Sequence, residues 1–259
     1  MEQFTIMQSE NSILEVKDIH FSYGKFKVLN GITLKVKKGG ITALIGPNGA
    51  GKTTFYNVIS GKFSPTKGKI FFNGKDITGL PAHKIVKLKL VRSFQITNVF
   101  PELTVLENIL IPLILEKGYT FAIFKNIKKF KDLYFQANEI LEKLKIADLK
   151  NKKVKELAYG DKRLVEIGIT FASSPEMILL DEPTAGMNPE ETERIVNLIK
   201  ELSENSNVTF FITEHDMNVV FAVSEYIFVL HQGRLLAQGT PNEIKNNSKV
   251  KEAYLGGSV

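Results

Sequence analysis

The 259-residue chain contains no cysteine. Disulfides, zinc–thiolate centres and iron–sulfur clusters with cysteine ligands are therefore excluded, and the composition fits a cytosolic protein. No stretch approaches the roughly 18 to 20 uninterrupted apolar residues that a membrane-spanning helix needs. The first residues, Met1-Glu2-Gln3-Phe4, lack a basic segment followed by an apolar core, so we expect no secretory signal. There is no internal repeat and no low-complexity tract.

Positive charge is concentrated in one part of the chain. The net charge is +6, and residues 117–155 alone hold eleven Lys against four Asp or Glu, a local balance of +7. Such a segment could bind anionic lipid head groups or nucleic acid. However, Leu, Ile and Phe interleave the lysines at helical spacing, and this pattern favours a solvated helical surface. The mean hydropathy of −0.04 is ordinary for a globular chain.

One glycine-rich segment carries the clearest functional signal. Gly46-Pro47-Asn48-Gly49-Ala50-Gly51-Lys52-Thr53 follows the apolar run Ile41–Ile45 and leads into residues 54–60, which have a helical pattern. Strand, glycine-rich turn, Lys-Thr and helix in this order are typical of the nucleotide phosphate-binding loop, the Walker A motif. The alternative is an ordinary turn between a strand and a helix, which the fixed positions and their context disfavour. The sequence therefore predicts binding of a nucleoside triphosphate.

The expected chemistry of this loop follows from its residue types. Glycines allow successive backbone N–H groups to curl around an anion without side-chain clashes. The helix that follows, with Thr54 at its start, adds unpaired N–H groups and the positive end of its dipole. We expect Lys52 to reach the β- and γ-phosphates and the Thr53 hydroxyl to bind Mg²⁺.

A pair of carboxylates follows a second apolar run. Met177-Ile178-Leu179-Leu180 is apolar throughout, as in a buried parallel strand, and it ends at Asp181 and Glu182. Ligands lie beyond the carboxyl ends of such strands. We therefore expect Asp181 to hold Mg²⁺ beside Thr53, directly or through water. Glu182 is expected to polarise or deprotonate a water aimed at the γ-phosphate. An acidic turn at a strand end is the simpler alternative.

The order of the expected elements predicts an α/β fold. Residues 13–19 and 28–36 are typical of strands, and a helical pattern extends from about 101 to 172. Strands and helices then alternate from 177 to 230, which argues for a parallel sheet with crossover helices. The expected parts are an N-terminal β-subdomain with the first part of the core (12–98), a helical subdomain (99–172), the second part of the core (173–240) and a C-terminal helical tail (241–259).

Taken together, these motifs resemble the nucleotide-binding subunit of an ABC transporter, and the likeness extends over residues 14–256. It implies a P-loop NTPase (RecA-like) parallel-sheet core, an N-terminal antiparallel β-subdomain and an inserted helical subdomain in a two-lobed architecture. It also implies ATP and Mg²⁺ as cofactors and ATP hydrolysis as the reaction. Further residues match family elements in family order: Tyr23 the aromatic that stacks on adenine, Gln95 the Q-loop glutamine at the metal or attacking water, Ala185-Gly186-Met187-Asn188 the D-loop, and His215 the switch histidine at the γ-phosphate.

The signature segment departs from the family pattern. Most members read Leu-Ser-Gly-Gly-Gln, whereas this chain reads Leu157-Ala158-Tyr159-Gly160-Asp161. Ala158 replaces the serine that donates to the γ-phosphate of the partner's nucleotide, which removes a charge-assisted hydrogen bond of about 1.5 to 3 kcal/mol. Backbone N–H groups around Gly160, at the start of a helix, still suit a phosphate. Asp161 adds a negative charge near that anion, and the sequence offers no reason for it.

The substitution at Ala158 also indicates a particular subgroup of this family. The signature segment, the run 181–189 and the closing Glu252-Ala253-Tyr254-Leu255-Gly256 resemble the ATP-binding subunits of branched-chain amino acid importers. Urea and amide importers share these features. The remaining alternatives are a lipid exporter ATPase, a soluble ABC ATPase of DNA repair or translation, and a regulatory module that holds ATP without hydrolysing it. The intact Glu182 and His215 argue against the last.

The resemblance also implies a location and a set of partners. We expect a cytoplasmic subunit, peripheral on the inner face of the cell membrane, that binds membrane permease subunits and no nucleic acid. A second, nonidentical ATP-binding subunit is expected to form a heterodimer with it, and a solute-binding protein to act indirectly. A permease coupling helix is expected to dock within residues 97–118. The apolar side chains there are also compatible with a core: Phe100, Leu103, Val105 and Leu106.

Overall fold

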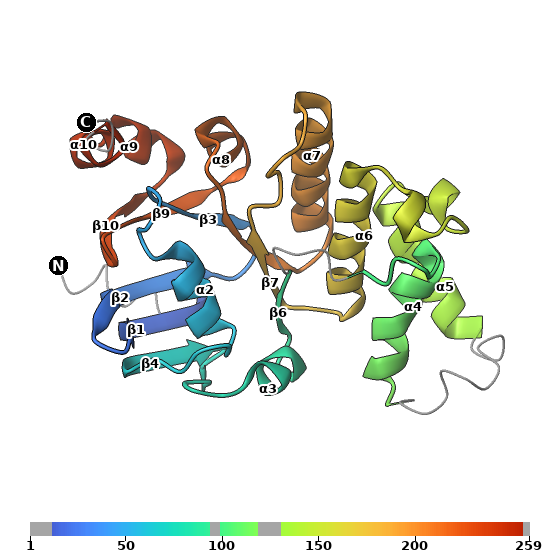
Figure 1. Cartoon of the computed structure of the whole chain (residues 1–259), viewed down its shortest axis with the longest axis horizontal. Helices are drawn as coiled ribbons and strands as arrows, with labels where there is room; N and C mark the ends of the chain where they lie inside the picture. The colour runs from blue at the N-terminus through green and yellow to red at the C-terminus, as the bar shows by residue number, and fades with distance from the viewer. Residues whose placement is uncertain (1–11, 94–98, 119–130, 256–259) are drawn as a thin grey trace.

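Two β-sheets surround the phosphate-binding loop (residues 46–53) in the computed structural model, which describes residues 12–93, 99–118 and 131–255 (Figure 1). The first sheet is antiparallel, in the order β2–β1–β4–β5. Its strands are β1 (Ser12–Tyr23), β2 (Phe26–Lys37), β4 (Lys67–Phe72) and β5 (Lys75–Asp76). The second sheet has the order β10–β9–β3–β8–β7–β6. Its strands are β3 (Ile41–Ile45), β6 (Leu90–Arg92), β7 (Met177–Asp181), β8 (Thr209–Thr213), β9 (Tyr226–His231) and β10 (Arg234–Gly239).

The central strands of the second sheet are parallel, and only the pairing of β10 with β9 is antiparallel among its described ladders. All five residues of β3, of β7 and of β8 are buried. Successive side chains of a strand point to opposite faces. In β3, Ile41 and Ala43 accordingly join one hydrophobic cluster, whereas Leu44 joins the other. Burial on both faces explains why these strands are continuously apolar in the sequence.

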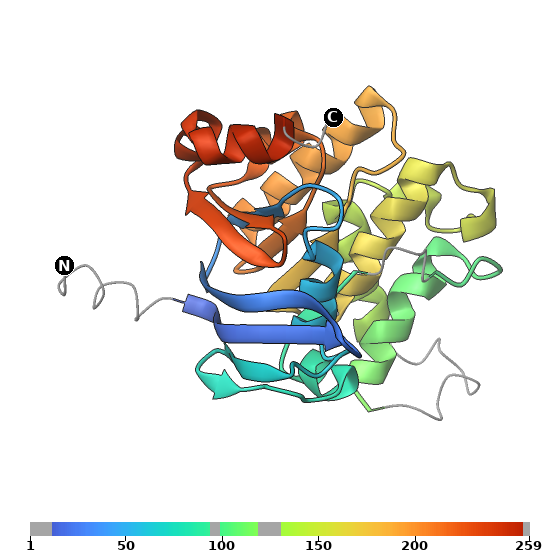
Figure 2. The ribbon, with the colours of Figure 1, turned by 60° about the vertical axis from the view of Figure 1, so that its left-hand side comes forward.

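Helix α2 (Lys52–Ile59), which begins inside the phosphate-binding loop, lies between the two sheets (Figures 1 and 2). Its side chains Phe55 and Tyr56 are fully buried in a cluster with residues of both sheets. The Tyr56 hydroxyl donates a hydrogen bond to the carbonyl of Phe211 in β8, at 2.7 Å. The loop is therefore held between a rigid strand and a helix that is fixed to the neighbouring strand.

A helical part packs beside the parallel sheet, at the right of Figure 1. It comprises α4 (Val105–Glu116), α5 (Lys131–Lys143), the short 3₁₀ turns η3 (Ala147–Leu149) and η4 (Val154–Glu156), and α6 (Tyr159–Ala172). Helix α4 begins at a capping box, in which Glu107 N donates to Thr104 Oγ1 and Thr104 N donates to Glu107 Oε2. A side chain at Gly168 of α6 would meet Ile109 of α4 at 2.6 Å, so these two helices are in close contact.

The remaining helices are α3 (Ala82–Lys87), α7 (Pro189–Asn205), α8 (Met217–Val223), α9 (Pro241–Asn246) and α10 (Ser248–Leu255). The last two lie against β10 at the edge of the second sheet (Figure 2). The expected alternation of strands and helices is present, although the tail forms two helices rather than one. Strand β1 extends beyond the expected range 13–19, because it continues to Tyr23 and pairs that residue with Phe26. The boundaries of the four expected parts stay a prediction.

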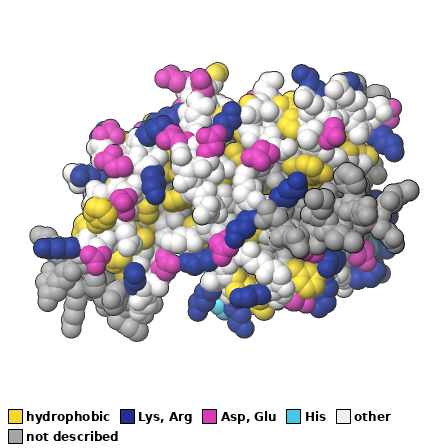
Figure 3. Space-filling model, turned by 180° about the vertical axis from the view of Figure 1, so that it is seen from behind, with side chains coloured by type: hydrophobic (Ala, Val, Ile, Leu, Met, Phe, Trp, Pro, Cys, Tyr) yellow, Lys and Arg dark blue, Asp and Glu magenta, His cyan; other side chains and the backbone are white. Residues whose placement is uncertain are grey.

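The basic segment 117–155 falls partly outside the described residues. Within its described portion, Lys145 pairs with Glu201 at 2.5 Å and Lys155 with Glu102 at 2.9 Å, both on the surface. Side chains of both signs are interspersed on the face of the molecule seen in Figure 3. These contacts fit a solvated surface. Among the described residues, no helix combines the length and the apolar character that crossing a bilayer requires.

Candidate nucleotide-binding site

The backbone of the phosphate-binding loop depends on glycine at two positions. Gly46 has a φ of +153°, and a Cβ there would lie 2.2 Å from the carbonyl oxygen of Leu230 in β9. Gly51 has a φ of +102°, and a Cβ there would lie 3.0 Å from Leu29 of β2. Both conformations are rare for residues with a side chain. The loop therefore packs against strands of both sheets, and its first and last glycines make that approach possible.

A hairpin turn supports the loop from behind. Gly233, between β9 and β10, donates its N–H to the carbonyl of Ala50 at 3.0 Å and accepts from the N–H of Asn30 at 2.8 Å. A Cβ at Gly233 would lie 1.9 Å from the carbonyl oxygen of Val28, so this position also requires glycine. The turn thus connects the loop to β2 as well as to β9. No sequence motif marks Gly233 as part of this support.

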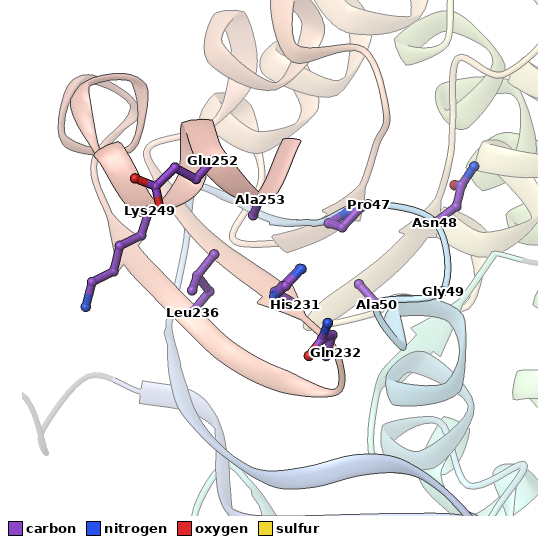
Figure 4. A pocket seen from close by; sticks show the side chains of 10 residues that line it. All are labelled: Pro47, Asn48, Gly49, Ala50, His231, Gln232, Leu236, Lys249, Glu252 and Ala253. Atoms are coloured by element: carbon purple, nitrogen blue, oxygen red, sulfur yellow. The ribbon is translucent and has the colours of Figure 1, made fainter. Parts of the chain in front are cut away.

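The C-terminal helix contributes to the same support (Figure 4). A cavity of about 740 Å³ lies between residues 47–50 of the loop, His231 and Gln232 of the hairpin, and Lys249 and Glu252 of α10. Tyr254, also on α10, is partly buried against the core and is hydrogen-bonded to the backbone of Gly46. Burial raises the pKa of Tyr254 to about 12, and the hydrogen bond opposes that rise. The tail therefore contacts the first residue of the loop.

A second cavity unites the two predicted motifs. It has a volume of about 310 Å³ and is lined on one side by residues 48–54 of the loop and on the other by Glu182 and His215. Lys52 is buried and donates from Nζ to the carbonyls of Gly46 at 2.6 Å and Pro47 at 3.3 Å. Burial lowers the pKa of Lys52, while the charges of Glu182 and Asp181 raise it. Glu182 and His215 therefore face the loop across this cavity.

Glu182 and His215 form a pair at the rim of this cavity. Nε2 of His215 lies 2.6 Å from Oε1 of Glu182, within hydrogen-bond distance, and both side chains remain partly exposed. Glu182 has a φ of +47°, which is unusual for a residue with a side chain. Its N–H donates to the carbonyl of Thr213 at 3.0 Å, which fixes this conformation directly after β7. Such backbone strain is frequent at functional sites.

The carboxylate of Asp181 is paired inside the fold. Its side chain is 1% exposed and does not line the cavity of Lys52 and Glu182. Its Oδ2 lies 2.7 Å from Nη2 of Arg92, and its Oδ1 accepts a hydrogen bond from Thr213 Oγ1 at 2.6 Å. The charge of the Asp181 carboxylate thus still acts on Lys52, whose pKa it raises, but its direct cationic partner is Arg92. No sequence motif marks Arg92 as this partner.

Comparison with known proteins fits this geometry. Residues 29–185 match the family model described as ABC transporter, and residues 234–259 match the one described as Branched-chain amino acid ATP-binding cassette transporter. The chain belongs to the ABC transporter family. The predicted resemblance, fold class and enzyme class are confirmed: this ABC ATPase binds nucleotide and hydrolyses ATP.

Individual relatives agree over nearly their full length. The chain is 39% identical over 249 residues to the high-affinity branched-chain amino acid transport ATP-binding protein BraF of Pseudomonas aeruginosa, covering 94% of this chain and 98% of BraF. LivG of Escherichia coli K12, of the same description, is 38% identical with the same two coverages. A solved ATP-binding cassette of an ABC transporter in its ADP conformation has a TM-score of 0.85 at 35% identity, covering 95% of this chain and 99% of that one.

The signature segment of this ABC ATPase packs against its own D-loop and α7. Tyr159 is 53% exposed, and its hydroxyl donates to the carbonyl of Ala185 at 3.3 Å. The N–H of Gly160 donates to Oε1 of Glu191 at 3.3 Å. Asp161 pairs with Arg194 of α7 at 2.7 Å, which supplies the reason for its charge that the sequence lacked. No described residue of 157–161, including Ala158, lines the cavity beside the loop.

Arg163 links the signature helix α6 to the end of β7. Its guanidinium is buried and donates to the carbonyls of Asp181 at 3.0 Å and Pro183 at 3.3 Å. It also pairs with Glu166 at 2.7 Å. Burial raises the pKa of Glu166, and Arg163 opposes that rise. The backbone on both sides of Glu182 is therefore fixed from within α6.

Three further predictions concern Tyr23, Gln95 and the region expected to dock a coupling helix. Tyr23 packs edge-on against Phe63, with ring centroids 5.6 Å apart, and it does not line the cavity beside the loop, whereas Phe26 does. Phe26 is 72% exposed, a signal that only the structure provides. Gln95 lies outside the described residues. In the region expected to dock a coupling helix, Val105 is core but Phe100 is 52% exposed.

Proposed function

We propose that this ABC ATPase is the ATP-hydrolysing subunit of an importer for branched-chain amino acids, located at the inner face of the cell membrane. The observation that carries the catalytic part is the cavity shared by the phosphate-binding loop, Glu182 and His215. The solute assignment is supported by the printed descriptions of BraF and LivG and by the family model that matches residues 234–259.

Each side chain of the cavity has a role in this proposal. Loop N–H groups and Lys52 bind the phosphates of ATP, and Lys52 exchanges its loop carbonyl partners for phosphate oxygens. Glu182 orients and deprotonates the attacking water, and His215 holds Glu182 and contacts the γ-phosphate. Phe26 and Tyr23 are the aromatic side chains available for the adenine ring. Gln95 completes the set at the attacking water.

Thr53, Asp181 and Gln95 are proposed to hold Mg²⁺. A hydroxyl, a carboxylate and an amide supply the hard oxygen ligands that Mg²⁺ prefers. In the described part of the chain, no three His, Cys, Asp or Glu side chains form a metal cluster. A cation held by one or two protein oxygens together with substrate phosphates fits this donor set. When bound, Mg²⁺ neutralises charge that develops on the phosphates.

A second ATP-binding subunit completes the site in this proposal. The signature segment is exposed at Tyr159 yet does not line the cavity of its own chain, which supports a role at the nucleotide of a partner. A solved ATP-binding cassette described as dimeric and bound to ADP and Pi is 27% identical to this chain, with a TM-score of 0.73. We propose a nonidentical partner, a permease that contacts the exposed Phe100, and a solute-binding protein outside the membrane.

The catalytic proposal is tested with Glu182→Gln. ATP affinity, measured by calorimetry on the purified chain, should stay near that of the unchanged protein, while ATP turnover by the assembled complex should fall by about 100-fold or more. Glu204→Gln, an exposed carboxylate of α7, is the matched control and should keep full turnover. Near-normal turnover in Glu182→Gln would remove Glu182 from the role of general base.

The solute is tested separately by uptake in cells. Cells whose only copy carries Glu182→Gln should lose uptake of radiolabelled leucine, isoleucine and valine but keep uptake of urea and acetamide. Loss of urea or amide uptake with normal leucine uptake would assign the chain to that related importer class.

Lys52→Ala should abolish measurable ATP binding; an unchanged dissociation constant would refute the phosphate-binding role of the loop.

A further inference from the structure

The carboxylate of Asp181 already has an internal counter-ion. Its Oδ2 lies 2.7 Å from Nη2 of Arg92, and its Oδ1 accepts from the Thr213 hydroxyl at 2.6 Å. The Arg92 and Asp181 side chains are 9% and 1% exposed. Their charges are therefore only weakly screened by solvent. Any cation that approaches Asp181 meets the positive charge of Arg92 at the same carboxylate.

Arg92 is fixed by the helix of the phosphate-binding loop. Its Nη1 donates to Oδ1 of Asn57 in α2 at 2.6 Å, and its guanidinium carbon lies 5.6 Å from the ring centroid of Tyr56 in the same helix. Both contacts place the cation between α2 and β7. Arg92 thus connects helix α2, which begins inside the phosphate-binding loop, to the carboxylate of Asp181.

The guanidinium also has an unused donor, and its residue lines the same cavity as two residues with unused polar atoms. Among the described residues, Arg92 Nε, Ser93 Oγ and Glu166 Oε1 are buried without a hydrogen-bond partner. All three residues line a cavity of about 140 Å³ between β6 and α6. Such a cavity is large enough for water, and its polar lining can bind it. Arg92 therefore has space and acceptors in a cavity that Asp181 does not line.

We propose that Arg92 sets the affinity of the nucleotide site for its divalent metal ion, by occupying the Asp181 carboxylate until the metal–nucleotide complex displaces it toward the cavity at Glu166. The inference rests on the proposed role of Asp181 at the metal. Two cations that share one buried carboxylate repel each other, so the ion pair lowers metal affinity. The acceptors in the cavity keep the displaced guanidinium from being buried without a partner.

The test measures Mn²⁺, a paramagnetic probe for the Mg²⁺ site, by electron paramagnetic resonance of the purified full chain with saturating ADP. Arg92→Met should bind Mn²⁺ more tightly, by on the order of tenfold, because the competing charge is gone. Arg92→Gln keeps a donor for Asp181 and guards against misfolding; it should also bind Mn²⁺ more tightly. Arg92→Lys should stay near the original affinity. Lys69→Met, which removes an exposed lysine paired with Asp76, is the matched control and should change nothing.

Asp181→Asn distinguishes failure of the inference about Arg92 from failure of the proposed metal role of Asp181. It should weaken Mn²⁺ binding with ADP. If it does so while Arg92→Met and Arg92→Gln bind Mn²⁺ no more tightly than the original chain, the inference is overturned and the metal role of Asp181 stands. If Asp181→Asn leaves Mn²⁺ affinity unchanged, the metal role of Asp181 fails and the inference fails with it. Circular dichroism establishes that each variant is folded before its affinity is measured.

Discussion

Replacing Arg163 by Met tests how the site carboxylates are held in place. Arg163 is 7% exposed, and the change removes its guanidinium, which donates to Glu166 and to the carbonyls of Asp181 and Pro183. Glu166 is itself 6% exposed, so it would be left as a buried charge without its cation. Breaking a buried pair in this way costs about 3 to 5 kcal/mol. That is a large part of a typical stability of about 5 to 15 kcal/mol.

The assay is urea unfolding followed by circular dichroism, as a function of pH. The pKa of Glu166 is raised from its ordinary value of 4.5 by burial, and loss of Arg163 should raise it further. A group with a raised folded pKa contributes stability that is fully present below about 4.5 and is lost as the pH rises through the folded pKa. The deficit of Arg163→Met should therefore be largest at neutral pH and shrink toward pH 4.5.

A double variant supplies the control. Arg163→Met combined with Glu166→Leu removes both charges and replaces them by apolar side chains, so it should recover most of the lost stability. The reasoning would be refuted if Arg163→Met lowered the free energy of unfolding by less than about 1 kcal/mol. It would also be refuted if adding Glu166→Leu did not restore that stability. ATP turnover of the folded single variant should also fall, because the backbone around Glu182 loses two of its anchors.

Three further changes have defined outcomes. Gly46→Ala should weaken ADP binding by at least about tenfold in calorimetry, because its Cβ would overlap the Leu230 carbonyl, whereas Gly74→Ala, strained but in open space, should not. Tyr254→Phe should weaken ADP binding about two- to tenfold through loss of one hydrogen bond to the loop; equal affinity would contradict that contact. Arg194→Met should lower turnover of the assembled complex while ADP affinity of the isolated chain stays unchanged, and a loss of ADP affinity would place Arg194 at its own chain's nucleotide instead.

The fold and the centre of the site could be predicted because they depend on local signals. The glycine spacing of residues 46–53 and the apolar strand before Asp181 each carry their meaning within a few positions. Their juxtaposition follows from the rule that ligands lie at the carboxyl ends of parallel strands. Helix α7 is equally local, since Asn188 and Glu191 form a capping box at its start.

The parts that the sequence could not supply depend on contacts between distant segments. Arg92 and Asp181 are 89 positions apart, and Asp161 meets Arg194 across 33 positions. Single residues of this kind have no periodicity and no motif, so nothing in the chain marks them as partners. The support of the loop by Gly233 and Tyr254 is of the same type. The sequence also could not show which aromatic side chain lines the cavity. Tyr23 and Phe26 are neighbours across one hairpin, and their environments differ because Tyr23 packs against Phe21 and Phe63.

The charged groups of the site share one property, which is that each already has a partner within the chain. Lys52 donates to two loop carbonyls, Glu182 lies against His215, and Asp181 pairs with Arg92. A nucleotide that binds through these groups must exchange each internal contact for one with phosphate, water or metal. Only the difference between the two contacts then contributes to affinity. Because Arg92 also contacts Asn57 and Tyr56 of α2, exchanging the partner of the Asp181 carboxylate for a cation would change the contacts between Arg92 and the loop helix as well.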